Sequence, residues 1–413
     1  MLFPHSPSSA APPRVVITGA GIITALGAGW KPNAEGFRAG RPAFRPVSLF
    51  DVSRQRAKFA AEVDLPDALP PTGLSGRQIA RLDRAGGMLL RAACEAWQQA
   101  GWKPAGNLPL VLGTTAGGMS LGEDYFRQAV QTPRRHGRQA TRAIHYQPQV
   151  QGRMVLDALG FTGPITIISN ACASGGNAIG HAWDLIRCGQ TECVLAGGYD
   201  ALSQLVFAGF DALQTLTPTR CRPFDARRDG LALGEGAAIV ALETLERARR
   251  RNASILGELI GYGTTIDQYH LTQPHPQGDA ALSAMTLACE SARVAPEDID
   301  YVNAHGTGTL LNDGAEALAI RRWAGHRAAT LPVSSTKAGI GHLLGGAGAV
   351  EAVVCLMALC GQWLPAQTAF EIPDPACNFP IVHQPRDARV NVALSNSFGF
   401  GGVNATLILR RWA

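Results

Sequence analysis

The sequence predicts a layered α/β protein with a mainly parallel sheet. Short apolar runs rich in valine and isoleucine alternate with longer segments of helical periodicity, which is the order that layered α/β proteins show. The 413 residues are 46% hydrophobic and only 17% charged, so the chain is long and apolar enough for a large core. This composition excludes a disordered or collagen-like chain.

The predicted elements follow from the local apolar pattern. Short runs of β-branched and other apolar residues predict strands at 14–18, 110–113, 166–169, 192–196, 237–242, 255–262, 301–304, 390–395 and 405–409. Longer segments with apolar residues every three or four positions predict helices at 82–100, 175–188, 279–292, 314–323 and 345–360. The apolar stretch 343–364 contains Glu351, and its longest uncharged run, 352–364, is shorter than the ~18 residues of a membrane span. We therefore expect a buried helix there and no membrane span.

Two halves of the chain repeat the same motifs in the same order. The strand and glycine loop at 111–118 has a counterpart at 302–309, and the segment 169–172 has one at 334–337. A glycine-rich helix is predicted after each of the latter two segments. We therefore expect a tail at 1–13, an N-terminal half at 14–253 and a C-terminal half at 254–413. Duplicated units of this kind place equivalent strand ends against each other, which predicts a site between the halves.

Charge and cysteine content narrow the class of protein further. The formal net charge of +5 is small and dispersed, which argues against nucleic acid as the main partner. The nine cysteines contain no C-x-x-C pair, and the first 13 residues lack a signal-peptide core. These features favour reduced thiols in the cytoplasm.

Cys172 is the candidate nucleophile. It lies in a turn between an apolar strand and a glycine-rich helix, where the helix dipole favours thiolate and lowers the thiol pKa. Small neighbouring residues and paired glycines at 175–176 allow a substrate to approach closely. A buried structural role remains the ordinary interpretation of the other cysteines.

Two histidines lie in glycine-rich loops of the other half, His305 at 303–309 and His342 at 336–342. A lone histidine of this kind is more often structural. Two of them opposite a candidate nucleophile favour a role as hydrogen-bond donors to an oxyanion or enolate. No nearby cysteine or carboxylate stands at metal-ligand spacing, so we expect no metal.

Further candidates surround these three residues. Lys337 and Glu316, each of which alone suggests a solvated ion pair, are expected to orient the histidines and set their protonation. The segment 396–404 contains exposed backbone amides and two phenylalanines, which suits an oxyanion hole with a mobile aromatic lid.

Taken together, these motifs resemble the β-ketoacyl-[acyl-carrier-protein] synthases, the elongating type II condensing enzymes of thiolase-like fold. The resemblance covers nearly the full chain, and its motifs are ACASGG at 171–176, RPFD at 222–225, RDG at 228–230, GEG at 234–236, NAHGTGT at 303–309, SSTKAGIGH at 334–342 and NSFGFGG at 396–402. It implies two duplicated βαβαβ halves that form an α-β-α-β-α sandwich of five layers.

The resemblance also implies roles for these residues. Cys172 would carry the acyl chain as a thioester, and His305 and His342 would stabilise the enolate formed when malonyl carrier protein loses carbon dioxide. The Cys172 and Phe400 amides would hold the oxyanion, Phe400 would act as gatekeeper, and Lys337 and Glu316 would fix the histidines. Further substrate-binding positions would be Ala116, Thr307, Thr309, Phe398 and Gly399. No cofactor is implied beyond the phosphopantetheine of the substrates.

Several positions bear on the subclass. Two histidines match elongating enzymes, since initiating enzymes pair histidine with asparagine, and Cys172 excludes a chain-length factor. The loop at 215–221 is shorter than is usual. Ala116 stands where the family often has isoleucine or phenylalanine, which predicts a roomier acyl pocket. Such departures also occur in secondary-metabolite ketosynthases, including those of aryl polyene pathways.

The implied partner is an acidic acyl carrier protein. Arg77, Arg81 and Arg84 at helical spacing, and a second cluster with Arg134 and Arg135, are its candidate contacts. For the second cluster, a solvated face is an equal alternative. The resemblance further implies a homodimer or a heterodimer with a related subunit.

Two other classes of protein share some of these sequence features. A nucleotide-binding protein is suggested by the glycine turn at 19–21, but this turn lacks the full G-x-G-x-x-G spacing. A non-catalytic subunit of the same fold is disfavoured because Cys172, His305 and His342 are all present.

Overall fold

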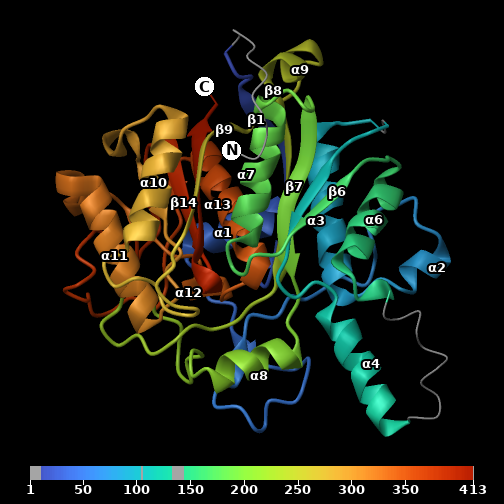
Figure 1. The fold of residues 1–413 in the computed structure, drawn as a ribbon, viewed down its shortest axis with the longest axis horizontal. Coiled ribbons are helices and arrows are strands. Elements are labelled where there is room, and N and C mark those ends of the chain that lie inside the picture. Colours follow the sequence, from blue (N-terminus) through green and yellow to red (C-terminus); the bar gives the residue numbers. More distant parts are fainter. Residues whose placement is uncertain (1–10, 104–105, 133–143, 413) are drawn as a thin grey trace.

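The computed structural model describes residues 11–103, 106–132 and 144–412, and these form alternating layers of helices and sheets (Figure 1). The tail expected at 1–13 lies mostly outside the described residues. From one outer face to the other the layers are helix, sheet, helix, sheet and helix. This confirms the predicted five-layer sandwich.

The two halves have the same strand order, which confirms the duplication. In the N-terminal half the order is β6-β5-β7-β8-β1, with bounds Ile165–Ile168, Leu110–Gly113, Cys193–Asp200, Gly236–Thr244 and Val15–Thr24. In the C-terminal half it is β11-β10-β14-β15-β9, with bounds Val333–Ser334, Tyr301–Asn303, Val392–Phe398, Val403–Arg411 and Gly257–Ile266. When the strands of each half are numbered in chain order, both halves have the order 3-2-4-5-1. Each strand therefore has a counterpart in the other half.

Each half is a mixed sheet, so the prediction of a mainly parallel sheet was wrong. Strand β5 pairs in parallel with β6 and β7, whereas β7–β8 and β8–β1 are antiparallel, and the second half repeats this pattern. In the second half the antiparallel pair β14–β15 is a hairpin closed by residues 399–402, and such a short connection permits no parallel pairing. A short antiparallel pairing of β1 with β9 joins the two sheets.

Six longer helices make the layers. Helices α3 (Arg84–Ala100) and α6 (Pro148–Leu159) lie on the outside of the first sheet, and α10 (Asp279–Ala292) and α11 (Leu310–Ala324) on the outside of the second. Helices α7 (Ser174–Arg187) and α13 (Ala347–Gly361) lie between the sheets and contact each other. All five predicted helices are therefore present, and α6 was not predicted.

The remaining elements are short or peripheral. The helices are α1 (Trp30–Ala39), α2 (Gly76–Ile79), α4 (Met119–Gln131), α8 (Gln204–Ala212), α9 (Leu245–Arg250) and α12 (Lys337–Ile340). The 3₁₀ turns are η2 (Pro296–Asp298), η3 (Gly325–Ala329), η4 (Leu344–Gly346) and η5 (Phe400–Gly402). The small strands are β2 (Gly27–Ala28), β3 (Arg45–Pro46), β4 (Phe59–Ala60), β12 (Trp363–Leu364) and β13 (Arg386–Asp387).

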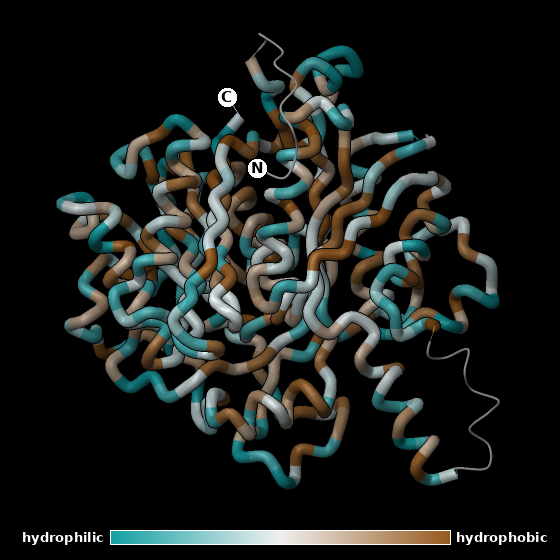
Figure 2. Tube along the Cα trace, viewed as in Figure 1, coloured by the Kyte–Doolittle hydropathy of each residue, from teal (hydrophilic) through white to brown (hydrophobic). Residues whose placement is uncertain are grey.

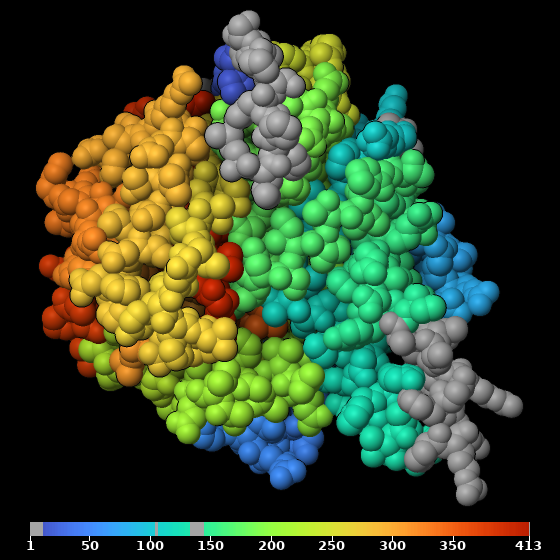
Figure 3. Space-filling model, viewed as in Figure 1, coloured from blue at the N-terminus to red at the C-terminus, as the bar shows by residue number. Residues whose placement is uncertain are grey.

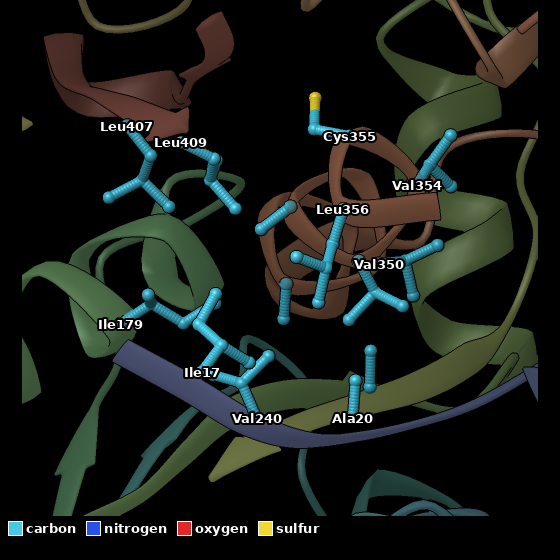
Figure 4. Packing of buried hydrophobic residues seen from close by; sticks show 14 of the residues in the cluster. Ile17, Ala20, Ile179, Val240, Val350, Val354, Cys355, Leu356, Leu407 and Leu409 are labelled. Atoms are coloured by element: carbon cyan, nitrogen blue, oxygen red, sulfur yellow. The ribbon is translucent and has the colours of Figure 1, made fainter. Parts of the chain in front are cut away.

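The central helix layer forms the main core. Val350 and Leu356 of α13 pack toward Ile17 of β1 and Val240 of β8 (Figure 4), and hydrophobic residues line the inner strands while polar residues predominate outside (Figure 2). The segment 344–361 is apolar and long enough to cross a membrane by length and composition, but 89% of it is buried between the sheets. It is the buried core helix that the sequence predicts.

Glycine allows the two central helices to approach closely. A Cβ added at Gly175 of α7 would lie 2.8 Å from the Gly345 carbonyl oxygen and from the Ala349 amide nitrogen. The N-terminus of α7 therefore lies directly against the segment that leads into α13, and this contact brings the loops of the two halves together.

Candidate active site

Cys172 lies in a strained turn between β6 and α7. Ala171 has a φ of 57°, a left-handed conformation that is unfavourable for a residue with a Cβ. The Ser174 hydroxyl holds the turn because it donates to the Ala171 carbonyl at 2.5 Å and accepts from the Asn170 N–H at 2.9 Å. The turn places the cysteine at the N-terminal end of α7, as the sequence predicts.

Burial dominates the chemistry of this thiol. Only 6% of Cys172 is exposed, and burial raises the pKa of its thiol to about 12, although Lys337 and the Phe400 backbone N–H act in the opposite direction. The prediction of a thiol acidified by the helix dipole was therefore wrong. In this buried site the loss of hydration is the largest effect on the thiol pKa.

His305 and His342 meet beside Cys172. Their ring centroids are 5.3 Å apart with the rings nearly perpendicular, and both side chains are buried. Burial, together with the nearby charge of Lys337, lowers the pKa of both histidines well below the usual value, so both are neutral at pH 7. The Nδ1 atom of each has no hydrogen-bond partner among the described residues.

Glu316 holds the backbone of the first histidine loop. Its carboxylate accepts hydrogen bonds from the His305 N–H at 2.8 Å and from the Gly306 N–H at 2.7 Å, and Asn396 donates to it from β14. Burial raises the pKa of Glu316 to about 7. Glu316 thus positions His305 through the main chain.

Lys337 pairs with Glu351 of α13 and not with Glu316. The Lys337 ammonium donates to the Glu351 carboxylate, and both side chains are 2% exposed. Burial raises the pKa of Glu351 to about 7. Sequence reasoning missed Glu351 as a site residue, although a lone carboxylate in an otherwise apolar helix was the signal that marked it.

Asp200 is a second missed residue. It ends β7, is completely buried, and accepts hydrogen bonds from the Thr114 hydroxyl and from the Thr115 and Ala116 amides. It also accepts from the Gly345 N–H at 2.6 Å, which ties the first half to the segment before α13. Its position at the carboxyl end of a strand was the signal in the sequence.

The aromatic loop lies directly against the nucleophile. A Cβ added at Gly399 would be 3.1 Å from the Cys172 amide nitrogen, so the absence of a side chain there leaves that amide open. The Phe400 ring stacks on Phe210 of α8 with centroids 5.8 Å apart. The Gly401 N–H donates to the Leu271 carbonyl at 2.7 Å.

These residues line one cavity of about 350 Å³. Its wall includes Cys172, His305, His342, Thr307, Thr309, Phe398, Gly399 and Phe400. The Thr307 and Thr309 hydroxyls are 2.9 Å apart. The structure thus brings together all of the cysteine, histidine, threonine and aromatic-loop positions chosen from sequence, and Lys337 and Glu316 are also buried.

Ala116 is the exception among the predicted substrate-binding positions. It is 6% exposed and packs in a separate apolar cluster with Phe207, Leu202 and Leu344, and it is not among the residues that line the cavity. The roomier acyl pocket expected from this position therefore stays a prediction, because the cavity does not reach Ala116. Ala116 lies in a tight turn, where its N–H donates a hydrogen bond to the Asp200 carboxylate.

The predicted arginine contacts divide into three kinds. Arg84 forms an ion pair with the buried Glu235 carboxylate and donates to the Val63 carbonyl, so it is a structural residue rather than a free contact for a partner. Arg77 and Arg81 are exposed at and after α2. Arg134 and Arg135 lie outside the described residues.

The RPFD motif and the nearby Asp313 have structural roles. Asp225 of the RPFD motif accepts from the backbone amides of residues 371 and 372, and Asp313 accepts from those of Phe224 and Thr307. They anchor the loops that surround the histidines. No group of three or more possible metal ligands occurs in the part of the chain that the structure describes.

The duplicated fold, and a cavity that joins a buried cysteine to two neutral histidines, define a condensing enzyme of the thiolase-like class. The β-ketoacyl synthase N-terminal domain matches residues 13–248 and the β-ketoacyl synthase C-terminal domain matches residues 256–371. The chain belongs to the β-ketoacyl synthase family, which makes it an acyltransferase-class enzyme.

Relatives from two kinds of pathway are equally similar to this chain. A 3-oxoacyl-[acyl-carrier-protein] synthase 2 of Synechocystis sp. is 37% identical over 97% of this chain and 98% of its own. A putative polyketide β-ketoacyl synthase 1 of Streptomyces halstedii is 37% identical over 96% and 97%. The solved ishigamide ketosynthase/chain length factor matches with a TM-score of 0.89 and 33% identity over 98% of this chain and 100% of its own.

Proposed function

We propose that this protein catalyses the decarboxylative Claisen condensation of malonyl carrier protein with an acyl chain bound to Cys172. The observation that carries the proposal is the single cavity in which Cys172, His305 and His342 meet. Cys172 supplies the nucleophile, and the neutral histidines supply hydrogen-bond donors without a competing positive charge.

Acyl transfer is the first half of the reaction. The Cys172 sulfur attacks the carbonyl carbon of the acyl thioester, the bond between that carbon and the carrier sulfur breaks, and the thiol proton leaves with the carrier thiol. The Cys172 and Phe400 amides are placed to hold the oxyanion. The Phe400 N–H donates a hydrogen bond to the Cys172 sulfur, and Gly399 has no side chain that would cover the Cys172 amide.

Condensation is the second half. The malonyl group loses carbon dioxide, and the electron pair of the broken carbon–carbon bond passes into an enolate. We assign the proton of each histidine to Nε2, because a buried Nδ1 without a partner is better tolerated as a lone pair than as an N–H. His305 and His342 then donate to the enolate oxygen. The enolate carbon attacks the acyl carbonyl, the bond from that carbon to the Cys172 sulfur breaks, and the thiolate takes up a proton from water.

No dissociable cofactor takes part in this scheme. The substrates carry their own activation as phosphopantetheine thioesters, and Thr307 and Thr309 present hydroxyls on the cavity wall that suit the amide groups of such an arm. Activity that persists after treatment with a chelator supports this proposal, and loss of activity restored by a metal contradicts it.

Fatty-acid elongation is the pathway that we propose first. The 37% identity to a 3-oxoacyl-[acyl-carrier-protein] synthase 2 supports it, and a polyketide β-ketoacyl synthase 1 has the same identity. A ketosynthase of a secondary-metabolite pathway, of the aryl polyene or type II polyketide kind, is the second candidate. The TM-score of 0.89 to the ishigamide ketosynthase/chain length factor favours this candidate.

We propose an acyl carrier protein and a second ketosynthase subunit, identical or related, as partners in the cytoplasm. Strand β6 ends the sheet with its apolar residues only half buried, and α4 exposes Phe126 and Val130 by 68% and 63%. An uncovered apolar edge and helix of this kind suit a subunit interface. All nine cysteines are free thiols, in keeping with a reducing compartment.

One experiment tests the reaction and the pathway together. The protein is incubated with malonyl carrier protein and with carrier proteins that bear saturated or polyunsaturated acyl chains of several lengths, and the products are identified by mass spectrometry. A 3-ketoacyl product two carbons longer, absent with Cys172→Ala, supports the reaction. Preference for saturated chains favours fatty-acid elongation, and preference for polyunsaturated chains favours the second candidate. No condensation with any carrier contradicts the proposal.

A further inference from the structure

One buried carboxylate, that of Asp200, binds loops from both halves of the chain. Asp200 is fully buried at the end of β7 and accepts hydrogen bonds from five groups. Four of them belong to the turn after β5, namely the Thr114 hydroxyl at 2.7 Å and the N–H groups of residues 115–117 at 2.8 to 3.2 Å. The fifth is the Gly345 N–H of the other half, at 2.6 Å. Backbone N–H groups can only donate, so this arrangement favours an ionised carboxylate.

Gly345 lies between two segments of the first half, with no room for a side chain. A Cβ added at Gly345 would lie 2.5 Å from the Thr115 amide nitrogen. On the other side, the Gly345 carbonyl oxygen would lie 2.8 Å from a Cβ added at Gly175 of α7. The turn that Asp200 binds, the Gly345 backbone and the helix that follows the nucleophile are therefore in direct contact.

His342 precedes Gly345 by only three residues, and η4 begins in the interval. On the N-terminal side, the His342 N–H donates to the Ala232 carbonyl at 2.7 Å. On the C-terminal side, the bond from Gly345 to Asp200 holds the chain. The placement of His342 is thus set from both sides, and Asp200 supplies one of them.

The nucleophile is held in a different way. The turn that contains Cys172 is closed by hydrogen bonds of Ser174, which belongs to the same segment. The segment after His342 is instead bound to Asp200 of the other half. The two halves are packed side by side in the space-filling view (Figure 3), and Asp200 is buried between their loops. Loss of its carboxylate should therefore displace His342 more than Cys172.

We propose that Asp200 is a positioning residue that sets the placement of His342 relative to Cys172. The proposal rests on the proposed function and adds a residue that acts on that site through the backbone. In the proposed reaction, decarboxylation needs the two histidines, whereas formation of the acyl-enzyme needs Cys172 and the oxyanion amides. Asp200 therefore acts mainly on decarboxylation.

The test measures the two half-reactions separately in Asp200→Asn. Release of carbon dioxide from malonyl-pantetheine reports on decarboxylation, and the burst with octanoyl-pantetheine reports on acyl-enzyme formation. We expect kcat for decarboxylation to fall about 30-fold, because a displacement of about 1 Å can cost 10²-fold in rate. The burst should fall less than about threefold, since the Asp200 charge raises the pKa of Cys172 and its removal does not disfavour acyl transfer.

Thr114→Val and Thr114→Ser provide a milder, matched pair. Valine has the shape of threonine without the hydroxyl, so it removes one of the five donors to Asp200 and should lower the decarboxylation rate about threefold. Serine keeps the hydroxyl and should restore the rate. This pair decides the proposal if Asp200→Asn does not fold.

Asp300→Asn is the remote control. The Asp300 carboxylate also accepts from two backbone amides, those of Asn391 and Val392, but it lies before β10 and outside the cavity wall. Its substitution should change neither rate.

An equal fall of both rates in Asp200→Asn would overturn the proposal, because Asp200 would then only support folding. Decarboxylation that is unchanged in Asp200→Asn, or equal in Thr114→Val and Thr114→Ser, would overturn it as well. Wild-type protein that neither releases carbon dioxide nor condenses the two substrates would instead overturn the proposed function.

Discussion

Cys172 shows how burial changes the chemistry of a single residue. The local sequence indicates an acidified thiol at a helix N-terminus, whereas the packed site removes the water that would solvate a thiolate. In the proposed reaction, catalysis then depends on donors that stabilise negative charge as it forms, and the amides and histidines of the same cavity are placed for this role.

The pH dependence of alkylation tests this conclusion. With a pKa of about 12, the thiolate fraction of Cys172 rises about tenfold for each pH unit across the neutral and mildly alkaline range. We expect the rate of iodoacetamide modification at Cys172, followed by mass spectrometry of its peptide, to rise in this way without a plateau. The exposed Cys188 in the same digest monitors the reagent. A plateau below pH 8 would contradict a raised pKa.

Lys337 acts on the histidines through its charge. It lowers the pKa of both His305 and His342, after the larger effect of burial. Removal of the charge therefore raises these pKa values, and loss of the neutral histidines on acidification begins at higher pH. In Lys337→Met we expect the acid limb of the kcat profile to move up by roughly 0.5 to 1 pH unit.

Glu351→Gln is the matched variant for this prediction. It removes the partner of Lys337 but keeps the ammonium charge, so the acid limb should not move upward. An acid limb that stays in place in Lys337→Met would mean that burial alone keeps the histidines neutral.

At the scale of elements, short connections bring the reacting groups together. The β14–β15 hairpin presents its loop to the turn before α7, and the Phe400 and Gly401 amides face the nucleophile and Leu271. Each contact joins segments far apart in the sequence. The geometry of the oxyanion site is therefore a property of the hairpin and the helix terminus together.

Gly399→Ala tests that geometry. Its φ of −127° suits alanine, so the substitution does not strain the backbone, but the new methyl group would come 3.1 Å from the Cys172 amide nitrogen. Blocking one oxyanion donor lowers the rate by about 10²-fold or more in comparable sites, and we expect that loss in the burst of acyl-enzyme formation. Gly314→Ala in α11 meets nothing within 4 Å and should leave the burst intact. An unchanged burst in Gly399→Ala would exclude the Cys172 amide as a donor.

For the whole molecule, the exposed charges of α2 bear on encounter with a carrier protein. Arg77 and Arg81 are exposed, whereas Arg84 is engaged by Glu235. Reversal of the first two charges in Arg77→Glu/Arg81→Glu should lower kcat/KM for carrier substrates about tenfold at low salt, with a smaller loss at high salt, because screening removes long-range attraction. The kcat/KM for octanoyl-pantetheine should be unaffected.

Arg386→Glu, at an exposed position of β13, is the control for net charge. An equal loss in this variant would show that only the overall charge matters. A loss with octanoyl-pantetheine as well would point to a folding defect.

Much of the fold and the site was predictable because it depends on patterns within short segments of the sequence. The alternation of apolar runs predicts the layers, and the echo of 111–118 in 302–309 predicts the duplication that the strand orders confirm. Cys172, His305 and His342 stand out because reactive side chains lie among glycines, and glycine loops at strand ends are where backbones meet a ligand.

The sequence by itself determined the class of fold, the repeat, the core helix at 347–361 and the candidate residues for the chemistry, since each depends on a pattern within one segment. Only the tertiary structure decided that Lys337 pairs with Glu351, that Asp200 ties the halves together, and that Ala116 is closely packed. It also decided the pKa of Cys172. These features depend on which groups, distant in sequence, are buried together. Burial, not local sequence, sets their pKa values and the strength of the interactions between them.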